Sequence, residues 1–161
     1  MNCRFAQIVT FFVFASGAAL ASEKPVAKSA VPKAVLQMVT TSYPKAKVLE
    51  TVLETEDSRK LYEVRLQTGE VRVDLKIDPS GKLVAQEHLV DVKAAPAAVT
   101  NAALAPPYEE WKINRVEKVD NLETPAQSGY EVMIEHQGIK REVLLATDGK
   151  LIRIEDADDK K

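Results

Sequence analysis

The sequence of 161 residues predicts an α+β fold, a tandem repeat of one helix plus a four-stranded antiparallel meander, in two layers, with the two sheets joined into about eight strands. The chain repeats itself, because the residues Tyr-Glu-Val at positions 62–64 return at positions 130–132. Apolar and polar residues alternate strictly, which predicts a sheet with one dry face and one wet face. Each copy also has one amphipathic helix, the natural cover for a dry face.

The two copies differ in length by a short insertion. The second copy follows the first by 64 residues near its start, where Pro-x-Ala-Val at positions 32–35 returns at positions 96–99. Near the end it follows by 68 residues, where Gly-Lys-Leu at positions 81–83 returns at positions 149–151. The extra residues fall in positions 122–129, a loop-like stretch where an insertion is tolerated.

The first unit is expected at residues 31–93 and begins with a helix over residues 31–42. Pro32 suits the first helical turn, and Tyr43-Pro44 ends the helix, because the residue before a proline avoids the α region. Four strands are expected at residues 47–54, 60–67, 70–78 and 82–89. The expected core residues are Leu49 with Val48 or Val52, then Tyr62, Val64, Leu66, Val71, Val73, Leu75 and Ile77.

The second unit is expected at residues 94–155 in the same order. A helix over residues 95–104 ends at Pro106-Pro107, and strands follow at residues 111–119, 130–136, 139–146 and 151–154. The expected core residues are Tyr130, Val132, Ile134, Ile139, Val143 and Leu145. Residues 156–161 are expected to be a charged tail.

The N-terminus predicts export. Residues 1–21 have the organisation of a signal peptide, with Arg4 before a long apolar run and Ala19-Leu20-Ala21 at the cleavage position. The apolar run is short for a membrane span of roughly 20 residues, and a retained anchor is the alternative. Residues 22–30 are expected to be a linker. We therefore expect a periplasmic or secreted protein that meets the membrane only during export.

Composition excludes several classes of function. Cleavage near Ala21 removes Cys3, the only cysteine, so the mature chain has no disulfide and no cysteine-based metal site. The remaining 21 basic and 24 acidic residues are interspersed, which is unlike a nucleic-acid binder. His88 and His136 lack metal-ligand spacing, and no nucleophile has a paired base. We predict no enzymatic activity, no cofactor and no metal site.

The wet face of the sheet is the candidate partner-binding surface. It is expected to present Glu63, Arg65, Arg72, Asp74 and Lys76 from the first unit, and Glu131, Met133, Glu135, Lys140, Glu142 and Leu144 from the second. In the functional interpretation Met133 and Leu144 are apolar anchors inside a charged platform. In the alternative, opposite charges on neighbouring strands stabilise the sheet by roughly a few tenths of a kcal/mol per pair.

An aromatic pair is the second candidate contact. Tyr108 and Trp111 follow Pro106-Pro107 near the boundary between the units. Exposed aromatic side chains often anchor an interface. The alternative is that both rings pack onto the second helix or between the units.

Three motifs carry a resemblance to a known family. They are Tyr43-Pro44 with Ala46 and Val48, then Tyr-Glu-Val at 62–64, then Asp78 with Gly81-Lys82-Leu83. With these motifs the chain resembles the PepSY-like family of bacterial envelope proteins, although the Tyr-Pro order is reversed in the second copy. The resemblance implies the tandem fold of beta-lactamase inhibitory protein. It also implies binding of a protein or peptide in the envelope, with enzyme inhibition as one form, and it supplies no catalytic residue.

The sequence therefore predicts an exported, non-enzymatic protein that recognises an envelope protein or peptide through its sheet surface. The alternative is a structural envelope protein that associates with its own copies through an exposed sheet edge.

Overall fold

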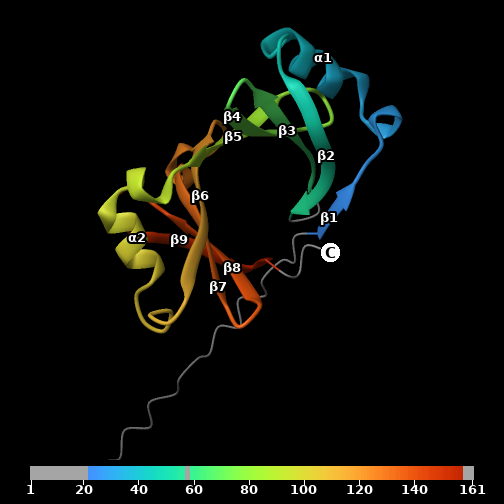
Figure 1. Cartoon of the computed structure of the whole chain (residues 1–161). Helices are drawn as coiled ribbons and strands as arrows, with labels where there is room; N and C mark the ends of the chain where they lie inside the picture. Colours follow the sequence, from blue (N-terminus) through green and yellow to red (C-terminus); the bar gives the residue numbers. More distant parts are fainter. Residues whose placement is uncertain (1–21, 57–58, 158–161) are drawn as a thin grey trace, which may run out of the picture.

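The computed structural model describes residues 22–56 and 59–157, which form one antiparallel sheet with two helices (Figure 1). The strands lie in the sheet in chain order from β1 to β9. They are β1 (Ser22–Pro25), β2 (Lys47–Glu56), β3 (Arg59–Thr68), β4 (Val71–Ile77), β5 (Leu83–Val90), β6 (Lys112–Asn121), β7 (Gly129–His136), β8 (Ile139–Leu145) and β9 (Leu151–Asp156). The helices are α1 (Lys33–Ser42) and α2 (Ala97–Ala103), and the short 3-10 helices are η1 (Lys28–Ala30), η2 (Val92–Ala94) and η3 (Pro125–Gln127).

The predicted α+β class is confirmed, but the number of strands is wrong. Residues 22–30 are not a linker, because β1 pairs with β2 at the edge of the sheet and η1 follows it. Pro25 lies in this strand, a position that proline tolerates because an edge strand leaves one side unpaired. The end of the chain also differs from prediction, since Asp156 belongs to β9 rather than to a tail. The predicted signal peptide and residues 158–161 lie outside the described residues.

Two helices cover the outer, convex face of the curved sheet (Figure 1). Val35 and Val39 of α1 pack with apolar residues of β3 and β4, and Val99 and Ala103 of α2 pack with those of β6, β7 and β8. The buried strand residues of the two clusters are Val64, Leu66, Val73, Leu75, Ile77, Val116, Val132, Ile134, Val143 and Leu145. Strict alternation thus sends one side of each strand into a core beneath a helix.

Three apolar residues expected in the core are instead exposed. Val71 and Ile139 have exposures of 56% and 52%, because each is the first residue of its strand after a hairpin turn and neither core cluster reaches it. Leu49 is 48% exposed, since the register of β2 shifts between Val48 and Glu50. Val52 is buried, but it lies opposite Glu63 on the other face of the sheet.

Four register irregularities accompany the curvature of the sheet. They lie between Val48 and Glu50, Lys76 and Ile77, Ile113 and Arg115, and Leu144 and Leu145. A β-bulge bends its strand and increases the local twist. Bulges spread over both halves of the sheet therefore favour a strongly curved surface with a concave inner face.

Glycine turns hold the helices close to the sheet. Gly81 and Gly149 have φ angles of +89° and +86°, in the region that favours glycine. A Cβ atom at Gly81 would lie 2.7 Å from the carbonyl oxygen of Ala34 in α1, and one at Gly149 would lie 2.5 Å from that of Ala98 in α2. Each turn thus needs glycine for both its conformation and its contact with a helix.

Among the described helices, none has the length and apolar character that a membrane crossing requires.

Candidate functional site

The concave face is the candidate site, because both described α-helices pack on the opposite face (Figure 1). Strand register places side chains of both charges on it: Glu63 lies opposite Lys76, Asp74 opposite Glu87, and Glu117 opposite Glu131. We use the term concave face for these residues and for their neighbours on the same side: Glu54, Arg65, Arg72, Arg115, Met133, Glu135, Lys140, Glu142 and Leu144. The predicted platform residues therefore do share one face.

The prediction that this face is wet is wrong for its carboxylates. Seven acidic residues of the concave face are buried: Glu54, Glu63, Asp74, Glu87, Glu117, Glu131 and Glu142. Leu144 is buried as well. A flat sheet would expose its polar face to solvent. Here curvature brings side chains from distant strands together, so the face is a hollow rather than a platform.

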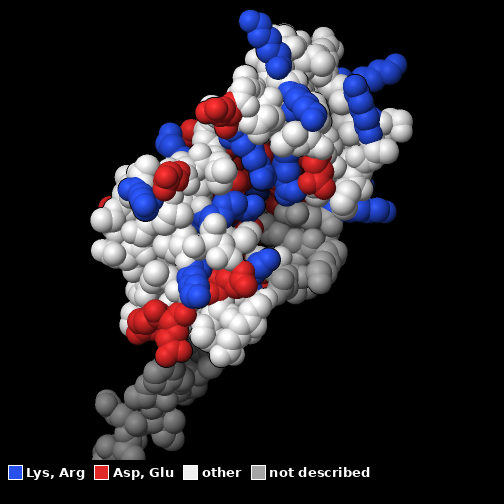
Figure 2. All heavy atoms as spheres, in the orientation of Figure 1, with Lys and Arg blue, Asp and Glu red and all other residues white. Residues whose placement is uncertain are grey.

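The hollow has a volume of about 230 Å³ and draws residues from β3 to β8. Its lining consists of Glu63, Arg65, Asp74, Lys76, Glu87, Arg115, Glu117, Glu131, Met133, Lys140, Glu142 and Ala157. Figure 2 shows Lys and Arg side chains gathered across the middle of the visible face, with Asp and Glu atoms between them. A smaller hollow of about 50 Å³, which includes Leu61, Val119 and Leu144, lies beside it and shares Lys76, Glu87 and Glu131.

Arginine side chains bridge the carboxylates of the first half of the hollow. Arg65 donates to Glu63 at 2.8 Å and to Glu50 at 2.6 Å, and Arg72 donates to Asp74 at 2.7 Å. Burial alone would lower the pKa of Arg65, but Glu63 and Glu50 outweigh it and raise the pKa above its usual value. These guanidinium groups therefore stay charged and hold the carboxylates in place.

Lys76 lies at the centre of the charged network. Its Nζ atom is 3.4 Å from a carboxylate oxygen of Glu54 on β2 and 3.4 Å from one of Glu87 on β5. In a flat sheet, strands three positions apart would be roughly 14 Å apart. Lys76 lies on β4 between them, adjacent to β5 and two strands from β2, so its long side chain can pair with both. Burial opposes the charge of Lys76, but Glu87 and Glu54 outweigh it and raise the pKa well above its usual value.

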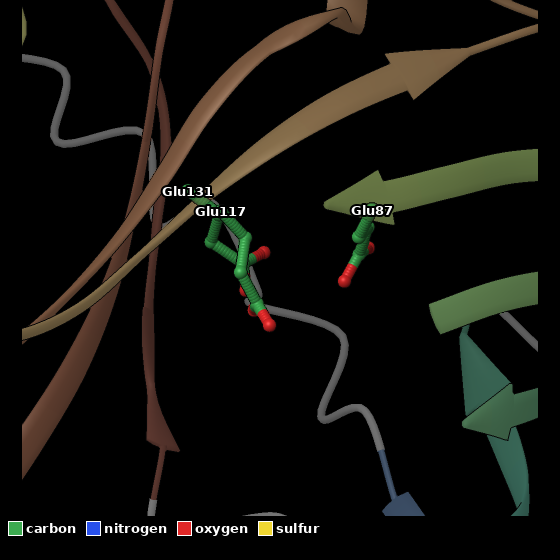
Figure 3. A group of neighbouring side chains, drawn as sticks. All are labelled: Glu87, Glu117 and Glu131. Atoms are coloured by element: carbon green, nitrogen blue, oxygen red, sulfur yellow. The ribbon is translucent and has the colours of Figure 1, made fainter. Parts of the chain in front are cut away.

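Three carboxylates converge on the hollow from adjacent strands, Glu87 on β5, Glu117 on β6 and Glu131 on β7. Oxygen atoms of the three lie within 4.8 Å of one another, and Figure 3 shows the side chains turned toward a common space. Like charges directly opposite each other destabilise a sheet, and Glu117 faces Glu131. Burial, followed by Glu131 and Asp74 and opposed by Arg115, raises the pKa of Glu117 to about 7. Burial also raises the pKa of Glu87.

The three carboxylates have the spacing that a hard cation needs, since such ions take several oxygen ligands. Two of them already pair with cations of the chain. Lys76 Nζ lies 3.4 Å from Glu87, and Arg115 Nε lies 3.0 Å from Glu117. We therefore assign no metal to this group and treat it as part of the hollow.

The predicted site residues divide between the hollow and its surroundings. Glu63, Arg65, Asp74, Lys76, Met133 and Lys140 line the hollow, Arg72 and Glu135 lie on the same face beside it, and Leu144 lines the smaller hollow. Sequence reasoning missed Glu87, Arg115 and Glu117. The signal for Arg115 and Glu117 is their alternation with the core residue Val116.

Tyr108 and Trp111 lie away from the concave face, against the core beneath α2. Their rings meet edge to face with centroids 5.2 Å apart, and the Arg141 guanidinium lies 5.8 Å from one ring and 5.9 Å from the other. His136 stacks on Trp111 at 5.9 Å. These contacts favour the packing alternative for the aromatic pair.

A family model described as "Putative beta-lactamase-inhibitor-like, PepSY-like" matches the chain twice, at residues 19–85 and 84–153. No protein with a curated description matches the chain.

Solved structures from Bacteroides species share the fold. A protein from Bacteroides eggerthii, described as "putative periplasmic", has 18% identity and a TM-score of 0.61 over 81% of this chain and 91% of its own. A DUF2874 family protein from Bacteroides uniformis has 21% identity and a TM-score of 0.60 over 78% and 88% of the two chains. A BLIP-like protein from Bacteroides fragilis has 20% identity and a TM-score of 0.56 over 78% and 86%.

Proposed function

Because this chain belongs to the PepSY-like, beta-lactamase-inhibitor-like family, we propose that it is an exported binding protein whose concave face captures a protein or peptide partner. The family description supports a non-enzymatic role, and inhibition of an enzyme is one form that the capture can take. We also propose that the chain is a tandem repeat of two PepSY-like units, at residues 31–93 and 94–155.

The hollow in the concave face is the observation that carries this proposal. Sheet faces are normally covered by a helix or a second sheet, or are exposed to water. The face opposite the described α-helices instead contains a hollow of about 230 Å³ with a charged lining. Buried like charges that face each other oppose folding, and shifted pKa values gather at functional sites. Such a lining is therefore expected of a binding site rather than of a face that only stabilises the fold.

The test is capture of a partner from the envelope fraction of the host, with residues 22–161 as bait. In one variant, Met133→Trp, a large side chain fills the hollow. In the matched control, Gln37→Trp, the same side chain is placed at an exposed position of α1. We expect the wild type and Gln37→Trp to capture the same partner and Met133→Trp to lose it while keeping its far-UV spectrum. Equal capture by the two variants would refute binding through the concave face.

Export is the second part of the proposal. The apolar N-terminal segment supports it, as does the periplasmic description of the relative from Bacteroides eggerthii. We expect the protein recovered from the periplasm to have the mass of residues 22–161. Recovery of the full-length mass from the membrane fraction would favour a retained anchor.

Self-association through a free sheet edge remains the alternative function. β1 and β9 are the outermost strands of the described sheet, and such strands offer unpaired backbone groups to another copy. Capture of only the bait's own copies, with a mass that rises with concentration, would favour this alternative.

A further inference from the structure

We infer that the protein attaches to the surface of an anionic phospholipid membrane through a basic layer around α1, on the side of the sheet away from the hollow. This inference goes beyond the proposed function, which concerns the concave face alone. Three features of the layer support it: its unopposed positive charge, the exposed apolar residues beside it, and its place in the fold.

The layer around α1 carries positive charge without negative charge. Residues 24–49, which run from β1 through α1 to the start of β2, contain five lysines and no aspartate or glutamate. All five are exposed, and none forms an ion pair with another residue in the described part of the chain. Figure 2 shows Lys and Arg side chains projecting around the end of the molecule where Figure 1 labels α1. We use the term basic cap for these residues: Lys24, Lys28, Lys33, Lys45 and Lys47.

The second unit shows that the fold does not require this charge. The equivalent stretch lies 64 positions later, at residues 88–113, and runs from the end of β5 through α2 to the start of β6. It contains two lysines and three acidic residues. The same layer therefore has five excess positive charges in the first unit and one excess negative charge in the second. Because the lysines of the basic cap also lack partners within the fold, they are better explained by binding than by stability.

Exposed apolar side chains lie beside the basic cap. Val48 and Leu49 follow Lys47 at the start of β2, and they are 46% and 48% exposed. Val71 is 56% exposed at the start of β4, across the end of β3 from them. Exposed apolar residues rimmed by charge mark interaction surfaces. At a membrane surface, aliphatic side chains enter the boundary of the acyl chains while lysines extend their charged ends to the phosphates.

Local charge, rather than the net charge of the chain, determines attraction to a membrane. Charges are screened beyond about 8 Å at physiological ionic strength, so acidic residues elsewhere on the molecule do not cancel the basic cap. α1 has 10 residues and is therefore about 15 Å long, which lets Lys33 at its start and Lys45 after its end meet different headgroups. Clusters of about four to eight basic residues are typical of surfaces that bind anionic lipids.

The place of the basic cap in the fold leaves the hollow free. α1 covers the convex face of the sheet, and the hollow lies in the concave face (Figure 1). Because none of the described helices can cross a membrane, the contact would be confined to the membrane surface. A protein attached through the basic cap can therefore keep its concave face open to a partner.

The test is cosedimentation of residues 22–161 with vesicles of phosphatidylcholine, or of an equimolar mixture of phosphatidylcholine and phosphatidylglycerol. The variant Lys33→Gln/Lys45→Gln removes two charges from the basic cap. The control Lys93→Gln/Lys112→Gln removes two charges from exposed positions of the second unit, so the net charge is the same.

We expect the wild type and the control to bind the mixed vesicles and not the phosphatidylcholine vesicles. Each lysine near an anionic membrane strengthens binding by a factor of about five, so Lys33→Gln/Lys45→Gln should bind about 25-fold more weakly. Equal weakening in the two variants would overturn the inference, because net charge alone would then explain it. So would equal binding to both kinds of vesicle, or no binding to the mixed vesicles, the result expected if the cap serves an acidic protein.

A second pair of variants tests the apolar contact. Leu49→Ser should weaken binding to the mixed vesicles severalfold, whereas Leu122→Ser, at a position that is 52% exposed on the second unit, should not. Free glycerol phosphate, at the phosphate concentration of the vesicles, should not compete. Competition by glycerol phosphate, or equal binding of the two leucine variants, would contradict attachment to a membrane surface.

This inference and the proposed function fail separately. Met133→Trp should bind the mixed vesicles like the wild type, and Lys33→Gln/Lys45→Gln should still capture the envelope partner. If vesicle binding is absent but capture through the concave face persists, only the membrane inference is wrong.

Discussion

At the scale of single residues, buried carboxylates determine how the protein responds to pH. The pKa of Glu117 is about 7 in the folded protein and near 4.5 in the unfolded chain, so the folded state binds the proton more tightly. The free energy of unfolding should therefore decrease as pH rises from about 4.5 to 7 and should level off above that range. One pKa unit corresponds to about 1.4 kcal/mol, so Glu117 contributes at most about 3 kcal/mol to this decrease.

Urea unfolding of the wild type and Glu117→Gln between pH 5 and pH 8 checks this prediction. The variant should be less sensitive to pH and more stable than the wild type at pH 8, because the glutamine cannot ionise. Glu70→Gln, at an exposed turn position, should follow the wild type. An identical pH slope in wild type and Glu117→Gln would contradict the shifted pKa.

Lys76 supplies a second prediction at this scale. Lys76→Met keeps most of the length and the apolar stem of the side chain but leaves Glu54 and Glu87 without their shared ammonium group. Removal of one partner from a buried ion pair destabilises a protein by roughly 3–5 kcal/mol. The midpoint of urea unfolding should fall accordingly, and Lys45→Met, at an exposed position, should leave it unchanged. A Lys76→Met variant as stable as the wild type would show that the network is not needed for folding.

At the scale of elements, glycine turns couple the helices to the sheet. Gly149→Ala would place a Cβ atom 2.5 Å from the carbonyl oxygen of Ala98 in α2, at a φ angle of +86°. Gly138→Ala has a similar φ angle of +84° but meets no atom within 4 Å. The conformational cost alone is roughly 1–2 kcal/mol for each. Thermal unfolding should show a larger loss for Gly149→Ala, and equal losses would show that α2 moves away without cost.

Most helices and strands of this fold can be predicted from the sequence. Regular alternation and glycine turns identify eight strands and both helices, because each pattern reflects burial on one side. β1 escapes prediction, since its residues are polar and include Pro25, and its pairing depends on the edge of β2. The exposure of Leu49 cannot be predicted either, because no residue pattern marks the register shift beside it.

At the scale of the whole molecule, the main difference between prediction and structure is the curvature of the sheet. Alternation correctly places Glu63, Asp74 and Lys76 on one face, but alternation describes a strand and contains no information on curvature. The ion pair between Lys76 on β4 and Glu54 on β2, two strands apart, therefore appears only in three dimensions. The convergence of Glu87, Glu117 and Glu131 depends on the same curvature and on pairing between β5, β6 and β7.

Site-specific photo-crosslinking in the living host tests most directly whether the concave face is the binding surface. A photoreactive phenylalanine analogue replaces Met133 in the hollow or, as the control, Gln37 on the outer face of α1. We expect a discrete crosslinked envelope protein from position 133 and none from position 37. Crosslinking of the same protein from position 37, with none from position 133, would contradict binding through the concave face.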